Sequence, residues 1–390
     1  MLVIHTQVAH TTSKEKTQEE GEAVKWLNNY RKVRTLGRGA FGKVSLYING
    51  ENGKPYAIKK VSKRVLQKQQ QQQRRSLKVT GGGGGTSPLK VREAEVLERC
   101  VPPHANVCRL VEIIDDPDSP SVYLCFEHAG RPLAEEVRAS RSRSISADFL
   151  LGALHQLLKG LAHLHRHGVV HGDLKMEHLL FKSVGENSSE QFEGEGATAA
   201  ADPTRFCIVD FGAAWAFDPE AREAERADWV TKSPGTPAYT APECCRLNDD
   251  DDDDDDDESS GNVGEMSGSY SGRKADVWAL GLAVYVIYYG AWPYSVAGEA
   301  SDLYEELRTL REVPFPPPGV READLVDAKN VDRGEGEGEG EGSGAGRVLS
   351  QVLRQMLRCD PALRPSAEEL LQNFSTVEEI EKLYVDSLHL

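Results

Sequence analysis

Short apolar runs, bounded by Gly and Asn-Gly turns, predict strands in the first third of the chain. These strands cover residues 34–36, 44–48, 56–59, 107–114 and 122–126. Before the fourth run, residues 89–100 place Val91, Ala94 and Leu97 on one stripe, which predicts a helix.

The rest of the chain follows the 3.6-residue period of a helix at several places. Helices are predicted at residues 147–167, 276–289, 348–358 and 366–373. The last is opened by Ser366 and Glu369, whose spacing is typical of a capping box. The longest apolar run, residues 277–289, is too short to cross a bilayer, so we expect a buried helix and no membrane partner.

Four segments have compositions that cannot build a core, and we expect them to be solvated inserts. They cover residues 67–88, 183–204, 246–272 and 319–346. Residues 1–30 are predicted to be a disordered tail. Residues 375–390 carry apolar side chains at helical spacing and are predicted to be a helical extension. The body between them, residues 31–374, is predicted to be one domain.

The net charge of −16 is concentrated in three of these inserts. Residues 183–204, 246–272 and 319–346 carry −5, −10 and −5, so the rest of the chain carries +4. A nearly neutral body gives no reason to expect a nucleic-acid surface. The seven cysteines have neither C-x-x-C spacing nor a paired framework, and the N-terminus has no secretory h-region. Both features favour a reducing intracellular location, cytoplasmic or nuclear.

A glycine pattern lies in the first predicted hairpin. Residues 36–44 read L-G-R-G-A-F-G-K-V, and glycine lets a backbone approach a phosphate chain where a Cβ would clash. Alone this pattern is weak, because the dinucleotide-binding turn of Rossmann folds shares it. Here a strand follows instead of a helix, and Val44 stands two residues after the last glycine, which favours the nucleotide loop of protein kinases.

The strongest signal is the order of the motifs. Residues 171–178 read H-G-D-L-K-M-E-H, which resembles the kinase catalytic loop H-R-D-L-K-x-x-N. Upstream stand the glycine pattern and A-I-K at 57–59. Downstream stand D-F-G at 210–212, A-P-E at 241–243, D-V-W at 276–278 and Arg364. This series, at these distances, resembles the protein kinase superfamily over about residues 31–374.

The resemblance implies an α+β, bilobal protein kinase-like fold with a small strand-rich N-lobe and a larger helical C-lobe. It implies transfer of the γ-phosphate of ATP to protein Ser/Thr hydroxyls. The implied ATP contacts are Leu36, Gly37, Gly39, Gly42, Val44, Ala57, Lys59, Glu127, Ala129 and Leu180.

The same resemblance implies a role for each catalytic side chain. Lys59, paired with Glu93, would bind the α- and β-phosphates, although Glu95 is a rival partner. Asp173 would accept the proton of the substrate hydroxyl, and Asp210 would hold Mg²⁺. Lys175 would neutralise the γ-phosphate, and together with Thr236 it is typical of serine/threonine kinases. We expect neither Lys59 nor Asp173 to fill the core.

Two positions depart from the kinase pattern. Gly172 replaces an Arg that pairs with a phosphorylated activation loop in many kinases, so we expect phosphorylation of that loop to be dispensable. His178 replaces the Asn that binds the second Mg²⁺, and Mn²⁺ accepts nitrogen ligands more readily than Mg²⁺. The alternative function is therefore a catalytically weak pseudokinase that acts as a scaffold.

Within the superfamily, the chain is similar to calcium/calmodulin-dependent protein kinase kinases and related upstream kinases. The features that carry this are the insert at 67–88, L-V-E-I-I-D-D-P at 110–117, and G-A-W-P-Y at 290–294. The resemblance implies protein substrates, among them other kinases. Residues 375–390 carry four acids and one Lys, whereas calmodulin targets are basic, so we expect no calmodulin binding.

Overall fold

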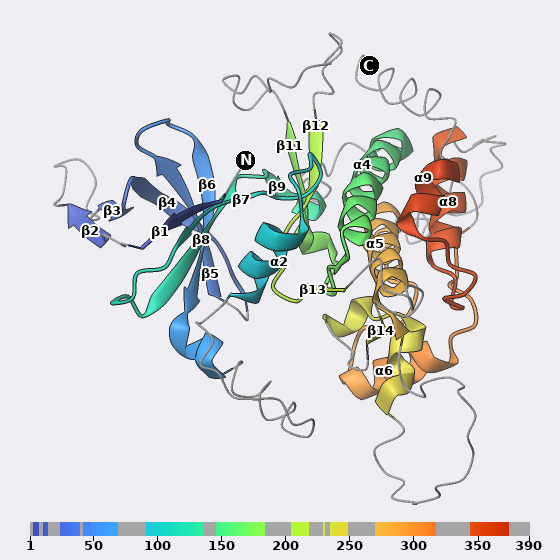
Figure 1. Ribbon diagram of the computed structural model, residues 1–390. Helices are drawn as coiled ribbons and strands as arrows, with labels where there is room; N and C mark the ends of the chain where they lie inside the picture. The colour runs from blue at the N-terminus through green and yellow to red at the C-terminus, as the bar shows by residue number, and fades with distance from the viewer. Residues whose placement is uncertain are drawn as a thin grey trace, which may run out of the picture. The chain divides into compact units, whose positions relative to one another are not determined.

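The computed structural model divides into two compact units, Met1–Ala129 and Gly130–Leu390 (Figure 1). The structure describes residues 3–7, 11–14, 24–39, 42–68, 91–135, 146–183, 204–217, 229–230, 235–248, 270–316 and 344–373. The predictions for the central parts of the four inserts and for the extension at 375–390 lie outside these residues.

The first unit contains an eight-stranded sheet in the order β1-β7-β8-β6-β5-β4-β3-β2. The strands are β1 (Ile4–Thr6), β2 (Thr11–Lys14), β3 (Val24–Leu27), β4 (Tyr30–Gly39), β5 (Gly42–Asn49), β6 (Pro55–Ser62), β7 (Leu110–Ile114) and β8 (Ser121–Glu127). Neighbours are antiparallel except β1 and β7, which are parallel. The predicted helix is α2 (Arg92–Cys100), and every predicted strand of this unit is present.

The prediction of a disordered tail over residues 1–30 is wrong for its described parts. Three strands, β1, β2 and β3, lie there. β1 and β2 read IHT and TTSK, and neither shows the apolar alternation that identifies a half-buried strand. Their pairing comes from backbone hydrogen bonds to β7 and β3, which the side-chain pattern does not encode.

The two edges of this sheet must approach each other, because four residues connect β1 to β2. Five Cα–Cα steps span at most about 19 Å, whereas the edges of a flat eight-stranded sheet lie about 34 Å apart. The sheet is therefore strongly curled. Its core includes Leu27, Tyr30, Ile58, Ile114, Tyr123 and Cys125.

A buried carboxylate anchors the N-terminal strand to this core. Glu112 on β7 accepts a hydrogen bond from the Tyr30 hydroxyl at 2.6 Å and another from Thr6 at 2.5 Å. Burial and the bond to Glu112 raise the pKa of Tyr30 well above its usual range, so the phenol stays protonated and remains a donor. β1 thus pairs with the edge of β7 and, through Thr6, also bonds to the carboxylate that binds Tyr30.

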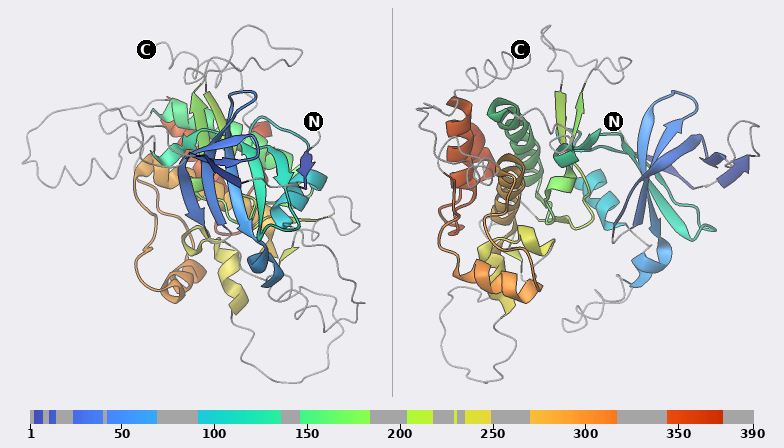
Figure 2. Two further views of the ribbon diagram at one scale, coloured as in Figure 1. Left: turned by 90° about the vertical axis from the view of Figure 1, so that its left-hand side faces the viewer. Right: turned by 180° about the vertical axis from the view of Figure 1, so that it is seen from behind.

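The second unit is mostly helical (Figures 1 and 2). Its α-helices are α4 (Ala147–Arg166), α5 (Gly272–Tyr289), α6 (Ala300–Thr309), α8 (Gly344–Met356) and α9 (Ala367–Asn373). α4 packs against α5, α8 and α9, and its leucine stripe is fully buried. Among the described residues, no helix is long and apolar enough to span a membrane.

Side-chain caps begin these helices where the sequence offers them. Ser146 accepts a hydrogen bond from Phe149 N at α4, and Ser271 accepts one from Lys274 N at α5. At α9 the predicted capping box is confirmed. Ser366 Oγ accepts from Glu369 N at 3.2 Å, and Glu369 accepts from Ser366 N at 2.7 Å.

Three small sheets complete the second unit. The first has the order β12 (Thr204–Ile208), β11 (Leu179–Ser183), β9 (Arg131–Pro132). The others pair β10 (Val169–Val170) with β13 (Trp215–Ala216), and β14 (Trp229–Val230) with β15 (Tyr270–Ser271). The ends of the predicted inserts therefore belong to regular elements. β15 and the first residues of α8 lie within their limits, and the insert at 183–204 shares its first residue with β11 and its last with β12.

Candidate active site

In the first unit, Lys59 on β6 and Glu93 on α2 form a buried ion pair. Their Nζ and Oε2 atoms lie 2.7 Å apart, and the residues are 5% and 4% exposed. The predicted partner is thus Glu93 and not its rival Glu95. Because Lys59 is buried, the expectation that it lies outside the core is wrong. Lys59 shares one face of β6 with the buried Val61, and the polarity of lysine conceals this burial in the sequence.

The three glycines of the β4–β5 hairpin differ in whether the fold leaves room for a side chain. A Cβ on Gly42 would lie 2.2 Å from the carbonyl oxygen of Lys60, so the sheet itself demands glycine there. A Cβ on Gly37 or Gly39 would meet no atom within 4 Å among the described residues. The fold of the first unit leaves space at these two positions, as a phosphate-binding backbone needs.

The remaining predicted ATP contacts are distributed over both units. Leu36 lies on β4, Val44 on β5, Ala57 on β6 and Leu180 on β11. Glu127 ends β8, and its carboxylate accepts a hydrogen bond from Arg109 N at 3.1 Å. Ala129 follows and is buried.

In the second unit, a buried aspartate on α5 fixes the catalytic loop. Asp276 is 2% exposed and accepts hydrogen bonds from the backbone N–H groups of His171 (2.8 Å) and Gly172 (2.9 Å). Its Oδ2 also lies 3.0 Å from His165 Nε2 on α4. The sequence placed Asp276 in a recognisable motif but did not predict this positioning role.

Two histidines hold the backbone of Asp173 from both sides. His171 Nε2 donates to the carbonyl of Val209 at 3.0 Å, so its Nδ1 is free to accept from Asp173 N at 3.3 Å. His178 Nδ1 lies 2.8 Å from the carbonyl oxygen of Asp173. Because both its N–H and its carbonyl are bonded, the backbone of Asp173 has little freedom to move, and this fixes where its carboxylate lies.

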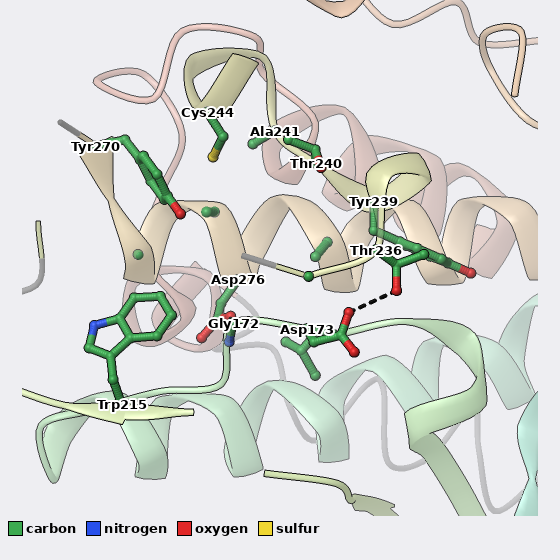
Figure 3. A pocket seen from close by; sticks show the side chains of 15 residues that line it. Gly172, Asp173, Trp215, Thr236, Tyr239, Thr240, Ala241, Cys244, Tyr270 and Asp276 are labelled. Carbon is green, nitrogen blue, oxygen red and sulfur yellow. Dashed lines mark hydrogen bonds between the residues drawn. The ribbon is translucent and has the colours of Figure 1, made fainter. Parts of the chain in front are cut away.

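The side chains of Asp173, Lys175 and Thr236 form a closed triangle, and Figure 3 draws its Asp173–Thr236 side. Lys175 Nζ donates to Asp173 Oδ2 at 3.0 Å and to Thr236 Oγ1 at 2.9 Å. The Thr236 hydroxyl donates to Asp173 Oδ1 at 2.9 Å. The sequence predicted all three residues, and the structure brings them together over 63 positions of the chain. A carboxylate with an adjacent ammonium can accept a proton and offset charge that develops nearby.

Asp210 and His178 lie together beside this triangle. Asp210 has a φ of 63°, which is uncommon for a residue other than glycine, and its Oδ2 is 3.6 Å from His178 Nε2. Burial, and then the neighbouring His171, lower the pKa of His178 to about 4, so the imidazole is neutral at pH 7.

These two side chains could both bind one divalent ion, to which they would offer one oxygen and one nitrogen ligand. Asp210 offers carboxylate oxygen, which suits Mg²⁺, and His178 offers imidazole nitrogen, which suits transition ions better. No cluster of three or more potential metal-ligating side chains occurs within the part of the chain that the structure describes. Any ion there would need further ligands from nucleotide or water.

Gly172 is enclosed by an aromatic ring that the sequence did not single out. Its φ is 75°, and a Cβ would lie 2.5 Å from the ring of Trp215. Figure 3 shows Trp215 beside a cavity that Asp276, Tyr270 and Cys244 also line. The cavity measures about 30 Å³, which is room for one water molecule. The available signal was a tryptophan three residues after D-F-G.

A buried ion pair ties the segment after Thr236 to the helices. Arg364 is fully buried and binds both carboxylate oxygens of Glu243, at 2.6 and 3.0 Å. Its guanidinium also lies over the ring of Trp278, 5.0 Å from the centroid. Glu243 of A-P-E and Arg364 are 121 positions apart in the sequence and form an ion pair in the structure.

Comparison with known proteins agrees with this geometry. The family model described as the protein kinase domain matches residues 30–374. Serine/threonine-protein kinase GRIK2 of Arabidopsis thaliana is 28% identical over 302 residues, covering 74% of this chain and 57% of that protein. GRIK1 of the same plant is 27% identical over 296 residues, covering 76% and 60%. The calcium/calmodulin-dependent protein kinase kinase of Caenorhabditis elegans is 27% identical over 283 residues, covering 71% and 44%.

The chain spans about half the length of these curated relatives. The matched family region covers most of the chain, and its strand-rich first unit and helical second unit confirm the predicted α+β kinase fold. The chain belongs to the protein kinase superfamily and is of the serine/threonine type.

Proposed function

We propose that this protein is an active ATP-dependent kinase that phosphorylates Ser/Thr hydroxyls of other proteins. The observation that carries the proposal is the closed triangle of Asp173, Lys175 and Thr236, because it sets a proton acceptor and a cation at one point. The Lys59–Glu93 pair supports it, since it holds a phosphate-binding ammonium ready in the first unit.

In the reaction, the substrate hydroxyl oxygen bonds to the γ-phosphorus while the bond from that phosphorus to the ADP oxygen breaks. Asp173 orients the hydroxyl and accepts its proton. Lys175 offsets charge on the transferred group, and Thr236 keeps both side chains in register. Lys59 binds the α- and β-phosphates. A bound divalent ion supplies further charge neutralisation when Asp210 holds it.

We propose further that the substrates are themselves protein kinases. The support is the name of one relative, a calcium/calmodulin-dependent protein kinase kinase, together with the sequence features shared with that group. Calmodulin itself is not expected as a partner, because the segment after the kinase domain is acidic. A reducing location inside the cell accords with six cysteines that are in no disulfide, namely Cys108, Cys125, Cys207, Cys244, Cys245 and Cys359.

A second candidate function is a catalytically weak scaffold. The observation that favours it is His178 in the position where the kinase pattern has Asn, because imidazole is a poor ligand for Mg²⁺. This candidate retains nucleotide binding through Lys59 and Asp210 but transfers no phosphate.

One assay separates the two candidates. Purified protein is incubated with labelled ATP, either Mg²⁺ or Mn²⁺, and a panel of activation-segment peptides from other kinases. A kinase labels Thr- or Ser-containing peptides, and the label disappears with Asp173→Asn but not with Glu177→Gln, an exposed carboxylate of the same loop. Nucleotide binding without transfer in both metals would establish the scaffold instead.

A further inference from the structure

Four lysines of the first unit, which we call the lysine row, stand on four neighbouring strands of the sheet. They are Lys25 on β3, Lys32 on β4, Lys43 on β5 and Lys60 on β6. Three of them lie two positions from a buried core residue of their own strand, namely Leu27, Tyr30 and Ile58. The remaining one, Lys43, is the direct cross-strand partner of Lys60. Residues two positions apart in a strand share a face, so all four side chains project from the core face of the sheet.

The register of the sheet places these ammonium groups against each other. Lys43 pairs with Lys60, and the register of β3 and β4, continued by one position, sets Lys25 opposite Lys32. Like charges directly opposite one another destabilise a sheet. Burial, and then the charges of the other three lysines, lower the pKa of Lys32. The row is therefore one group of mutually repelling charges.

The row has no counter-charge in its surroundings. Lys59 and Lys63, close by in the sequence, each form an ion pair with a carboxylate. No such pair joins a member of the row to any carboxylate that the structure describes. The lysine stems do cover apolar core, since Lys60 Nζ lies 5.7 Å from the centroid of the Tyr123 ring. That contact does not require four cations to gather, and edge protection does not either, because all four strands lie inside the sheet.

The chain itself carries a segment of the opposite charge. Residues 249–257 are nine consecutive aspartates, which we call the aspartate run, and residues 246–272 together carry a net charge of −10. The row crosses three gaps between strands, which is about 14 Å. An extended segment advances about 3.4 Å per residue, so roughly four or five acidic residues cover that length. The aspartate run is long enough to neutralise the whole row.

From this complementarity we propose that the lysine row binds the aspartate run of a second copy of this chain. Each copy carries both features, so two copies make the contact twice in a reciprocal two-fold pair. Single exposed ion pairs are weak, and the second contact strengthens the pair because it forms within one complex. The net charge of −16 on each copy does not prevent association, because physiological salt largely screens charges farther apart than about 8 Å.

Cross-linking between two isotopic forms tests the proposal on the wild-type protein. Full chains that contain ¹⁴N or ¹⁵N are mixed and treated with a carbodiimide, which joins carboxylates to amines in direct contact. We expect linked peptides of mixed isotope that join residues 249–257 to the lysine row. Links confined to one isotope would mean that the run binds its own chain, and would overturn the proposal. Links spread evenly over exposed lysines outside the row would overturn it too.

Charge-matched variants then identify the surface, with sedimentation equilibrium as the measurement. Lys43→Gln/Lys60→Gln removes two charges of the row and should weaken self-association by about tenfold or more. Lys54→Gln/Lys159→Gln removes two exposed charges elsewhere, one in each unit, and should leave it unchanged. Replacement of the nine aspartates by asparagine, or high salt, should abolish it.

The failures of this inference are distinct from those of the kinase proposal. Equal weakening by both lysine pairs would mean that total charge, and not the row, governs association. A wild-type chain that stays monomeric at physiological salt would also overturn the inference. Either result leaves the proposed function intact, because phosphate transfer to peptides is measured separately. Circular dichroism of each variant shows whether a loss of association is a loss of fold, and the cross-links of the wild type decide the matter if it is.

Discussion

Asp173 is constrained at its backbone by His171 and His178 and at its carboxylate by Lys175 and Thr236. Enzymes gain rate from groups that are already in position, since no reorganisation is then required at the moment of reaction. Asp173 is thus held at both its backbone and its carboxylate by residues of the second unit.

Asp173→Asn keeps the size of the side chain and removes its charge. We expect kcat to fall by roughly 10²–10⁴, because both proton acceptance and charge stabilisation are lost. The melting temperature should change little, since the side chain is 18% exposed and its contacts are polar. Steady-state kinetics measure the effect, with Glu177→Gln as control. Transfer near the wild-type rate would contradict the assignment.

Lys59 presents a different case, because its loss affects the fold as well as the reaction. Lys59→Ala leaves the carboxylate of Glu93 buried without its cation, and breaking such a pair costs about 3 kcal/mol of unfolding free energy. The double variant Lys59→Ala/Glu93→Ala should recover part of that loss without recovering activity. Urea unfolding of the two single variants and the double variant measures the coupling. A coupling energy near zero would contradict this explanation.

At the residue scale, the sequence predicted the catalytic triangle and the Lys59–Glu93 pair, because motif residues stand at recognisable spacings. It could not predict that Trp215 fills the space beside Gly172, or that His171 and His178 both bind the Asp173 backbone. Those contacts join residues through the fold, and nothing local in the sequence records them. The burial of Lys59 was missed because a charged side chain looks exposed until its partner is known.

At the scale of elements, the segment after D-F-G is held by packing and strand pairing. β13 carries Trp215 against Gly172, and β14 pairs with β15 at the start of α5. In many kinases an Arg at position 172 would bind a phosphate on this segment. Here a Cβ at that position would already collide with the Trp215 ring.

We therefore expect phosphorylation of this segment to be dispensable. Protein treated with phosphatase should keep most of its activity toward peptide substrates, because backbone pairing and Trp215 perform the anchoring. The candidate phosphorylation positions, Thr231 and Ser233, lie outside the described residues. Activity before and after treatment is compared, with phosphate removal checked by mass spectrometry. A large loss on dephosphorylation would mean that another basic residue binds the phosphate.

Elements with a strong pattern were predicted well. The leucine stripe of α4, the capping box of α9 and the central strands of the sheet all correspond to regular elements of the structure. Elements whose stability comes from a neighbour were not predicted. β1 and β2 are short and polar, and β14 and β15 have two residues each, so only their partners define them.

At the scale of the whole molecule, buried histidines link stability to pH. Burial, and then the charge of Lys159, lower the pKa of His155 to about 4, whereas an unfolded chain has a value near 6.5. Between these values the unfolded chain binds a proton that the folded chain does not, so the free energy of unfolding falls as the pH is lowered.

We expect His155 to contribute up to about 3 kcal/mol to the loss of stability between pH 6.5 and 4. His155→Gln cannot take up the proton, so its stability should depend less on pH over this range, whatever its absolute value. Urea unfolding of the wild type and of His155→Gln at several pH values measures the two slopes. Equal slopes in wild type and His155→Gln would contradict the prediction.

The short strands at the two ends of the first sheet have a practical consequence for anyone who prepares this protein. A recombinant fragment trimmed to the limits of the family match would begin at residue 30 and lose both end strands. A shorter deletion, of residues 1–23, removes β1 and β2 but keeps β3. The backbone groups of β7 and β3 that had paired with the deleted strands are then unpaired. Exposed strand edges of this kind can pair with strands of other molecules. We expect this fragment to be poorer in colloidal stability than the full chain, with a light-scattering signal that grows with concentration. Equal scattering from both proteins would mean that residues 1–23 do not protect the sheet from self-association.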